Sequence, residues 1–348
     1  RGERVMSDKD KNKNLIICGG WNSKMGPADL YGILEKLPQK KDENLLVGYN
    51  SDDDAAVYMI NDTEAIIQTV DFFPPNVSDP YIFGKIAATN AVSDIFAMGG
   101  DVTLALNILA FPKNGDKDIL SNILKGGQEV VNAAGGIIAG GHTISDNSVK
   151  YGLSVTGKVK LDGLIKNNTV NAGDHLILTK PLGVGIIVSA YNAGEATEEN
   201  FKKAVKSMTT LNRTASEVMR KYGVSACTDV TGFGLLGHLK EMLNDKFSAI
   251  VSVNKLPIID GAYEYAQQFL TTGGGQKIRE YLEDSIDFKI DDYAMEEILY
   301  DPQTSGGLLI SISEDKALSL VKELREKGVT ANDIGVITDK QEYSIKVN

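Results

Sequence analysis

The hydrophobic positions of this chain fall into short apolar runs separated by turn residues. In the first half these runs lie at residues 45–49 (LLVGY), 55–60 (AAVYMI), 65–70 (AIIQTV), 104–111 (LALNILAF), 136–141 (GIIAGG) and 152–159 (GLSVTGKV). Runs of this length, bounded by Gly, Asn and Asp, predict β-strands. The second unit is expected to start near HLILTKPLG (175–183). In it, AIVSVN (249–254) is strand-like, and Tyr343, Ile345 and Val347 alternate with polar residues near the end.

Helix signals stand between these runs. Asp79 and Pro80 are typical of the N-cap and first helical positions, and Gly99-Gly100 is typical of a helix end. One helix with a buried face is therefore predicted from Pro80 to about Met98. The last helix is predicted to begin after Ser313 and to stop at Gly328. Further helices are predicted at 28–34, around 117–134, near 199–222 and at 235–244.

Strands and helices mix without strict βαβ alternation, which favours an α+β fold. A polar, turn-rich stretch near 160–172 marks the expected boundary between two domains. We expect a flexible, glycine-rich segment at 1–45, an N-terminal domain at 46–165 and a C-terminal domain at 166–348. Codons for Arg1-Gly2-Glu3 can resemble a ribosome-binding sequence, so Met6 is the expected initiator.

Composition narrows the classes of function. The chain has 348 residues, with 36 Lys and Arg against 47 Asp and Glu, and a formal net charge of −11. Binding to nucleic acid through a positive surface is therefore not expected, although an acidic chain can hold a nucleotide through Mg²⁺ and backbone N–H groups. No apolar run approaches the roughly 18 residues of a membrane span. Only Cys18 and Cys227 occur, which fits a reducing compartment, so we expect a cytoplasmic protein without a membrane partner.

Acidic residues recur at the edges of Gly, Ser and Thr clusters. The clusters lie at residues 51–58 (SDDDAAVY), 70–73 (VDFF), 93–100 (SDIFAMGG), 228–234 (TDVTGFG) and 301–307 (DPQTSGG). Carboxylates spread over several loops suit Mg²⁺ bound to a phosphate substrate. Since Mg²⁺ is usually held by few carboxylates, only some of these residues are expected to be ligands, and the others to be caps or turn formers.

Asp94 differs from the other acidic residues because it falls within a predicted helix, four residues after Asn90. Residues at this spacing share one side of a helix. A carboxylate near a core needs a partner. That partner is either an intrahelical or capping hydrogen bond, or a metal ion or nucleotide at the helix end.

Three glycine-containing segments invite a phosphate-binding interpretation. AGGHT (139–143) is either a plain strand-end turn or a backbone seat for phosphate, with His142 a satisfied polar residue rather than a metal ligand. Lys24 follows a glycine-rich stretch and is either solvated or able to close over a phosphate. GFGLLG (232–237) matches G-x-G-x-x-G, but no convincing strand and βαβ unit surround it, which argues against a dinucleotide site.

Taken together, seven segments resemble the selenophosphate synthetase (selenide, water dikinase) family, of the superfamily that includes aminoimidazole ribonucleotide synthetase and thiamine-phosphate kinase. They run in family order as NLLVGYNSDDDAAVY, TVDFF, FGKIAATNAVSDIFAMGG, AGGHTI, LTKPLGVG, TDVTGFGLLGHL and DPQTSGGLL. The resemblance implies two α+β domains and a homodimer formed through the strands of the N-terminal domains. It implies that selenide, ATP and water give selenophosphate, AMP and phosphate, which supplies selenium for selenocysteine and selenouridine.

The resemblance also implies cofactors, partners and residue roles. The cofactors are Mg²⁺ and, as monovalent activator, K⁺; a protein that delivers selenide is a further implied partner. Asp54, Asp94 and Asp229 are the implied metal ligands, and Lys24 is the implied essential lysine. The implied nucleotide contacts are Lys24, Ser51, Asp52, Asp53, Asp71, Asp94, Gly141, His142 and Thr143.

Trp21 departs from the family, which has Cys or selenocysteine three residues before the lysine. The first explanation is a UGA codon, normally read as selenocysteine, that appears here as Trp. It is favoured because UGA differs from the Trp codon by one base and a bulky Trp has no structural motive in a glycine-rich loop. The second is a genuine Trp in a paralogue that binds ATP but handles selenium poorly, and the third is that Cys18 takes over.

Two other functions stay open. A catalytically silent ATP-binding paralogue, acting as a regulator or scaffold, is supported by Trp21 alone. Another small-molecule kinase or ligase of the same superfamily is the second alternative, and the segments DPQTSGG and TDVTGFGLLGHL argue against it.

Overall fold

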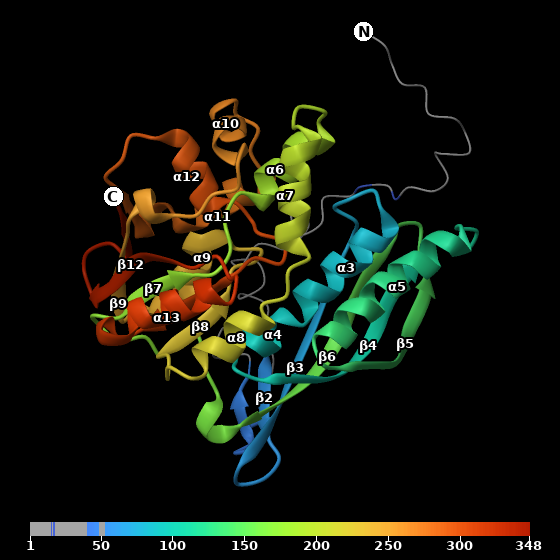
Figure 1. Cartoon of the computed structure of the whole chain (residues 1–348), viewed down its shortest axis with the longest axis horizontal. Coiled ribbons are helices and arrows are strands. Elements are labelled where there is room, and N and C mark those ends of the chain that lie inside the picture. Colours follow the sequence, from blue (N-terminus) through green and yellow to red (C-terminus); the bar gives the residue numbers. More distant parts are fainter. Residues whose placement is uncertain (1–14, 16, 18–39, 49–52) are drawn as a thin grey trace.

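The computed structural model describes residues 15, 17, 40–48 and 53–348, which form two halves, each built around one β-sheet (Figure 1). The predicted helix at 28–34 lies outside the described residues, as do Trp21, Lys24, Ser51 and Asp52. Within the described part of the chain, no helix is both long enough and apolar enough to span a membrane.

The first half contains six strands and three α-helices within the described residues. The strands are β1 (Leu45–Val47), β2 (Ala56–Met59), β3 (Glu64–Phe73), β4 (Asp101–Phe111), β5 (Ile137–Ser145) and β6 (Lys150–Lys160), and the helices are α3 (Pro80–Ala91), α4 (Ser93–Ala97) and α5 (Lys117–Ala133). The sheet order is β1-β2-β3-β6-β4-β5, and only the β4–β5 pair is parallel. A short 3-10 turn, Leu161–Gly163, follows β6.

Helices cover one face of this sheet. Helices α3 and α5 pack against each other and lie over β6 and β4 (Figure 1). Strand β3 shows the resulting alternation, because Ala65 and Ile67 are buried whereas Gln68 and Val70 are exposed. The opposite face of the sheet therefore carries exposed side chains.

The start of α3 confirms the predicted cap. Asp79 accepts hydrogen bonds from the N–H groups of Tyr81 (2.8 Å) and Ile82 (3.0 Å), and Pro80 is the first helical residue. The prediction of one helix to Met98 is wrong, because α3 ends at Ala91 and α4 begins at Ser93. The reason is local: ψ of Val92 is −10°, away from the α-helical value near −42°.

The second half contains seven strands in the order β10-β13-β9-β12-β7-β11-β8. Their bounds are β7 (His175–Leu178), β8 (Ala226–Asp229), β9 (Phe247–Val251), β10 (Ile286–Phe288), β11 (Leu308–Ile312), β12 (Asn332–Asp339) and β13 (Ile345–Val347). The α-helices are α6 (Val184–Asn192), α7 (Glu198–Met208), α8 (Arg213–Met219), α9 (Gly234–Leu243), α10 (Ala262–Gln267), α11 (Gly273–Leu282), α12 (Tyr293–Tyr300) and α13 (Glu314–Glu326). Two 3-10 turns, Val253–Lys255 and Glu283–Ser285, complete the described elements of this half.

Helices cover both faces of the second sheet. On one face, α8 and α13 pack in one cluster with Ile177, Leu308 and Ile310 of β7 and β11. On the other face, α9 contacts β8 and β9. Every position of β11 is buried as a result, and its sequence is correspondingly apolar apart from Ser311.

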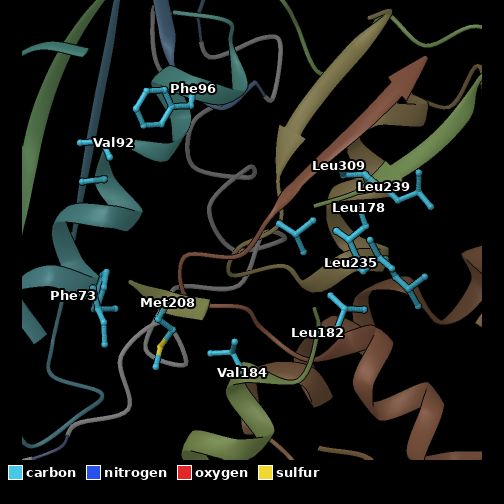
Figure 2. Close-up of a cluster of buried hydrophobic side chains, with 14 of the residues drawn as sticks. Phe73, Val92, Phe96, Leu178, Leu182, Val184, Met208, Leu235, Leu239 and Leu309 are labelled. Atoms are coloured by element: carbon cyan, nitrogen blue, oxygen red, sulfur yellow. The ribbon is translucent and has the colours of Figure 1, made fainter. Parts of the chain in front are cut away.

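One hydrophobic core continues through both halves. Phe73, Val92 and Phe96 of the first half belong to the same buried cluster as Leu178, Leu235 and Leu309 of the second, and Met208 lies between them (Figure 2). The surface where the halves meet is therefore held together by hydrophobic packing, and that surface also carries the polar site described below.

The strands expected in the first half are all present, with ends shifted by a few residues. The last helix begins after Ser313, although the Ser313 side chain makes no capping hydrogen bond, and Gly328 follows its end with φ of +79°. The interpretation of GFGLLG missed a strand, because β8 precedes it and α9 begins at Gly234. Its conclusion still holds, since β8 pairs with β11 alone among the described strands, and antiparallel, so no βαβ unit forms.

Candidate active site

Carboxylates from distant parts of the sequence meet where the two halves join. Asp53 and Asp54 lie just before β2, Asp94 lies in the first turn of α4, and Asp229 ends β8. Helix α4 contacts both β8 and β3, which brings Asp94 and Asp229 toward each other. The three metal ligands implied by the resemblance, Asp54, Asp94 and Asp229, are therefore gathered in one region.

Asp54 is held by a neighbour of Asp229. Its Oδ1 accepts a hydrogen bond of 2.6 Å from the Thr228 hydroxyl. Burial raises the pKa of the Asp54 carboxyl well above its usual value, and the negative charges of Asp229 and Asp53 raise it further. Asp53 accepts hydrogen bonds from the N–H groups of Asp54 (3.1 Å) and Asn167 (3.2 Å), and burial raises its pKa to about 6.

Asp94 faces strand β3 rather than its own helix. Its Oδ2 accepts a hydrogen bond from the Thr69 hydroxyl, so the intrahelical alternative is not what satisfies it. Burial raises the pKa of Asp94 well above its usual value, and the charges of Asp71, Asp229 and Asp54 add to the rise. The Asn90 amide donates to Asp71 Oδ2 at 2.8 Å. Asn90 and Asp94, the two polar residues of the predicted helix, therefore both make hydrogen bonds to β3.

Two carboxylate oxygen atoms of this cluster are available to coordinate a cation. Among the described residues, the Oδ2 atoms of Asp53 and Asp54 are buried and accept no hydrogen bond. No group of three acidic, His or Cys side chains in this part of the chain is already arranged around a single point. This arrangement fits Mg²⁺, which takes few protein carboxylates and completes its shell with water and phosphate oxygens.

Gly141, His142 and Thr143 lie away from this cluster. Asp71 pairs with Leu153, Leu153 with Asn107, and Asn107 with Gly141, so Asp71 and Gly141 lie in one row across the sheet. Three strand spacings separate them, which is about 14 Å. Residues 141–143 are exposed on edge strand β5, whereas α3 and α5 cover the sheet face between that edge and Asp71 (Figure 1).

Asp301 is a helix cap rather than a candidate ligand. Its Oδ2 accepts from the N–H groups of Gly185 (2.9 Å) and Ile186 (3.2 Å), at the start of α6. Gln303 accepts from the N–H groups of Gly183 and Val184, both at 3.2 Å. The acidic residue of DPQTSGG therefore satisfies the free N–H groups of a helix that is distant in sequence.

The Asp301 carboxyl should make stability depend on pH. Burial raises its pKa from 3.8 to about 7. The folded chain therefore binds this proton more tightly than the unfolded chain, and its contribution to stability is lost as pH rises toward 7. We expect the melting temperature of the wild type, relative to Asp301→Asn, to fall between pH 5 and 8 in thermal melts.

Asp146 provides the control for that experiment. Lys150 donates a hydrogen bond to Asp146 and lowers its pKa, so Asp146 is ionised in both states over this pH range. The difference in melting temperature between wild type and Asp146→Asn should stay constant. A constant difference for Asp301→Asn as well would contradict the titration of Asp301 near neutral pH.

Sequence reasoning missed Lys180, Thr228 and Ser305. Lys180 is buried, and its Nζ donates to the carbonyl groups of Thr210 (2.6 Å) and Ser305 (2.8 Å). The sequence analysis singled out DPQTSGG for its acidic residue and LTKPLGVG as a family motif, and nothing in their spacing shows that the two segments pack together. Cys227 is fully buried, and burial raises the pKa of its thiol, which disfavours the nucleophilic thiolate.

Comparison with known proteins places the chain among enzymes. The AIR synthase related protein family matches in two parts, its N-terminal domain at residues 52–159 and its C-terminal domain at residues 171–348. The chain is similar to a selenide, water dikinase of Agathobacter rectalis, at 48% identity over 97% of this chain and 99% of the relative. It is also similar to a selenide, water dikinase of Carboxydothermus hydrogenoformans, at 49% identity over 94% of this chain and 96% of the relative.

Solved structures share the fold at lower identity. A thiamine-monophosphate kinase from Stenotrophomonas maltophilia superposes with a TM-score of 0.65 and 19% identity, covering 94% of this chain and 96% of that one. AaThiL complexed with AMPPCP and TMP superposes with a TM-score of 0.66 and 16% identity, covering 92% of this chain and 93% of that one. These structures support the two-part α+β architecture.

Proposed function

The chain belongs to the selenide, water dikinase family of AIR synthase related proteins, and we propose that its buried carboxylates are where ATP and selenide react. Enzymes of this family form selenophosphate from selenide, ATP and water. The observation that carries the proposal is the meeting of Asp54, Asp94 and Asp229 between the two halves, with the pKa values of Asp54 and Asp94 raised by burial and further by their acidic neighbours. Such a cluster favours cations.

The carboxylates have separate tasks in this proposal. Asp54, Asp94 and Asp229 would hold Mg²⁺ together with phosphate oxygens and water. Bound Mg²⁺ supplies charge neutralisation for phosphoryl transfer. Asp53 and Asp71 adjoin the cluster and would contact the nucleotide. Lys24, Ser51 and Asp52 are assigned to the nucleotide from the family motifs alone.

Selenide needs positioning more than activation. At neutral pH it is mainly HSe⁻, which is already a strong nucleophile and requires little general-base help. The site has to reduce the repulsion between this anion and the γ-phosphate and to align the attack. We assign the reduction of this repulsion to Lys24 together with the metal ions. K⁺ activation, delivery of selenide by another protein and a cytoplasmic location also belong to this proposal.

A second copy of the chain would complete the nucleotide site. The uncovered face of the first sheet exposes Val70 and Leu106, which lie in one row because both pair with Ser154, together with Phe72 and Ile144. Apolar surface of this kind favours association. Because α3 and α5 block the path from Gly141 to Asp71 within one chain, we infer that residues 141–143 reach the nucleotide of the partner copy.

The dimer can be tested at Leu106. Leu106→Lys places a charge in the proposed interface, so we expect a monomer by light scattering and an ATP affinity at least about tenfold weaker. Leu318 is more exposed, at 81% against 42%, but it lies on α13 in the second half. Leu318→Lys should therefore leave both quantities unchanged. A Leu106→Lys dimer with normal ATP affinity would contradict this interface.

The reaction itself is tested by ³¹P NMR. The full chain is incubated anaerobically with ATP, Mg²⁺, K⁺ and selenide. We expect selenophosphate, AMP and phosphate to appear together and only when selenide is present. If the Trp21 chain and Trp21→Cys both bind ATP and neither releases AMP in response to selenide, the silent paralogue is supported instead; activity of Trp21→Cys alone would support the recoded selenocysteine.

A further inference from the structure

Lys180 is the one buried cation among the residues that the structure describes. It comes two residues after β7 and lies against the turn that precedes β11, where its Nζ donates to the carbonyls of Ser305 (2.8 Å) and Thr210 (2.6 Å). Burial lowers the pKa of Lys180 to about 7, while the nearby negative charge of Asp229 opposes that change. The ammonium group therefore lies at the edge of the carboxylate cluster, within the electrostatic influence of Asp229.

The turn that Lys180 holds is tightly confined. Ser305 is fully buried and has φ of +52°, a conformation that residues other than glycine rarely adopt. A Cβ atom at Gly306 would approach the Val230 carbonyl oxygen to 2.0 Å, and one at Gly307 would approach the backbone nitrogen of Lys180 to 2.4 Å. Close packing on both sides leaves the Ser305 peptide one arrangement, which its hydrogen bonds stabilise.

From this turn a chain of hydrogen bonds leads to the first half. The Ser305 N–H donates to Asn90 Oδ1 at 2.9 Å, and Asn90 Nδ2 donates to Asp71 Oδ2 at 2.8 Å. An amide with both ends engaged cannot flip, so the side that faces Asp71 is a donor. Asp71 therefore receives a fixed hydrogen bond whose orientation depends on a lysine in the other half of the chain.

We propose that Lys180 is a positioning residue for ATP, which acts through Ser305 and Asn90 to orient the Asp71 carboxylate. The proposal rests on the proposed function, in which Asp71 contacts the nucleotide. Without the ammonium group the Ser305 carbonyl loses a donor and the strained peptide can relax. Its N–H then leaves Asn90, and Asp71 loses the partner that fixes its orientation.

The test measures binding of the magnesium complex of a non-hydrolysable ATP analogue to the full chain by calorimetry. Lys180→Met keeps the length of the side chain and removes its donors, and Asn90→Leu breaks the next link. Each substitution should weaken binding about tenfold. Both substitutions break the same chain of hydrogen bonds. The double variant should therefore bind the analogue with about the same affinity as the single variant that binds it less tightly.

Lys316 provides a matched control. It also donates to a backbone carbonyl, that of Tyr222 at 3.0 Å, but it is on α13 and outside the chain of hydrogen bonds. Lys316→Met should bind the analogue normally. If Lys180→Met does not fold, Lys180→Leu, which also lacks donors and is smaller, replaces it with the same expected result.

The following results distinguish a failure of the positioning proposal for Lys180 from a failure of the assignment of Asp71 to the nucleotide. Multiplied effects in the double variant, or a lower melting temperature of the Lys180 variant with unchanged affinity, would overturn the positioning role and leave Lys180 a structural residue. Asp71→Asn tests the premise. If it leaves the affinity unchanged, the assignment of Asp71 to the nucleotide is wrong; if it weakens binding while Lys180→Met does not, only the positioning proposal fails.

Discussion

The Asp94→Asn variant is expected to lose selenophosphate synthesis by about a thousandfold and yet to be more heat-stable than the parent chain when no metal is added. The loss follows because an amide is a neutral and weaker ligand for Mg²⁺ than a carboxylate. The gain in stability follows because Asp94 is buried near Asp71, Asp229 and Asp54, whose charges raise its pKa. Replacing it removes one member of a set of like charges.

The pH dependence of this stability has a definite sign. A carboxyl whose folded pKa lies above its unfolded pKa stabilises the fold least at high pH. The advantage of Asp94→Asn in melting temperature should therefore grow as pH rises, by a few degrees in all. Mg²⁺ should stabilise the parent chain and have less effect on the variant. Activity is compared by ³¹P NMR with the same residue at position 21 in both chains.

Asp101 offers a control for the Asp94 experiment. It lies at the start of β4 and is exposed, with Arg220 at 3.1 Å as its ion-pair partner. Asp101→Asn should keep full activity and should not gain stability. An Asp94→Asn variant that retains activity, or that melts earlier than the parent at every pH, would contradict the role of Asp94 in the cluster.

The second large effect is expected at position 21. Trp21→Cys should turn over selenide at least about a hundredfold faster than the chain with Trp, because a thiolate can take the part of the family's chalcogen nucleophile and indole has none. Lys24 follows three residues later in the sequence, and a lysine close to the thiol would favour its thiolate form. The rate is measured anaerobically from the selenophosphate and AMP signals.

Two variants make the result at position 21 specific. Trp21→Ser has nearly the size of cysteine without a thiolate, so it should be as slow as the parent. Cys18→Ser in the Trp21→Cys chain should keep the activity, which would exclude Cys18 as the substitute nucleophile. Equal rates for Trp21, Cys and Ser would show that this position takes no chemical part in the transfer, and a UGG codon would end the selenocysteine explanation.

Local features of the sequence predicted much of the secondary structure. Asp79 and Pro80 begin a helix because cap geometry depends on neighbouring residues alone, and the alternation of Ala65, Ile67 and Thr69 marks a strand with one buried face. The break at Val92 was not predictable in this way. Asn90 and Asp94 engage Asp71 and Thr69 on β3, and those contacts exist only in the folded chain.

The roles of the acidic residues divide in the same manner. Asp54, Asp94, Asp229 and Asp301 all lie in or at the edge of segments that contain small or hydroxyl residues. The sequence therefore suggested carboxylates for a cation without deciding which ones. Folding brings the first three together and turns Asp301 toward the start of α6, where it is a cap. Local sequence cannot separate these outcomes, because a carboxylate's partner is set by packing between distant segments.

By itself, the sequence determined the α+β class, the strands of the first half to within a few residues at their ends and, through its motifs, the family and its reaction. The tertiary structure decided three further points: Gly141 lies about 14 Å along the sheet from Asp71, Lys180 is buried beside the cluster, and both halves share one hydrophobic core. The physical reason is range. Caps and alternation act over a few residues, whereas burial, strand order and the meeting of like charges depend on residues from about twenty to more than a hundred positions apart.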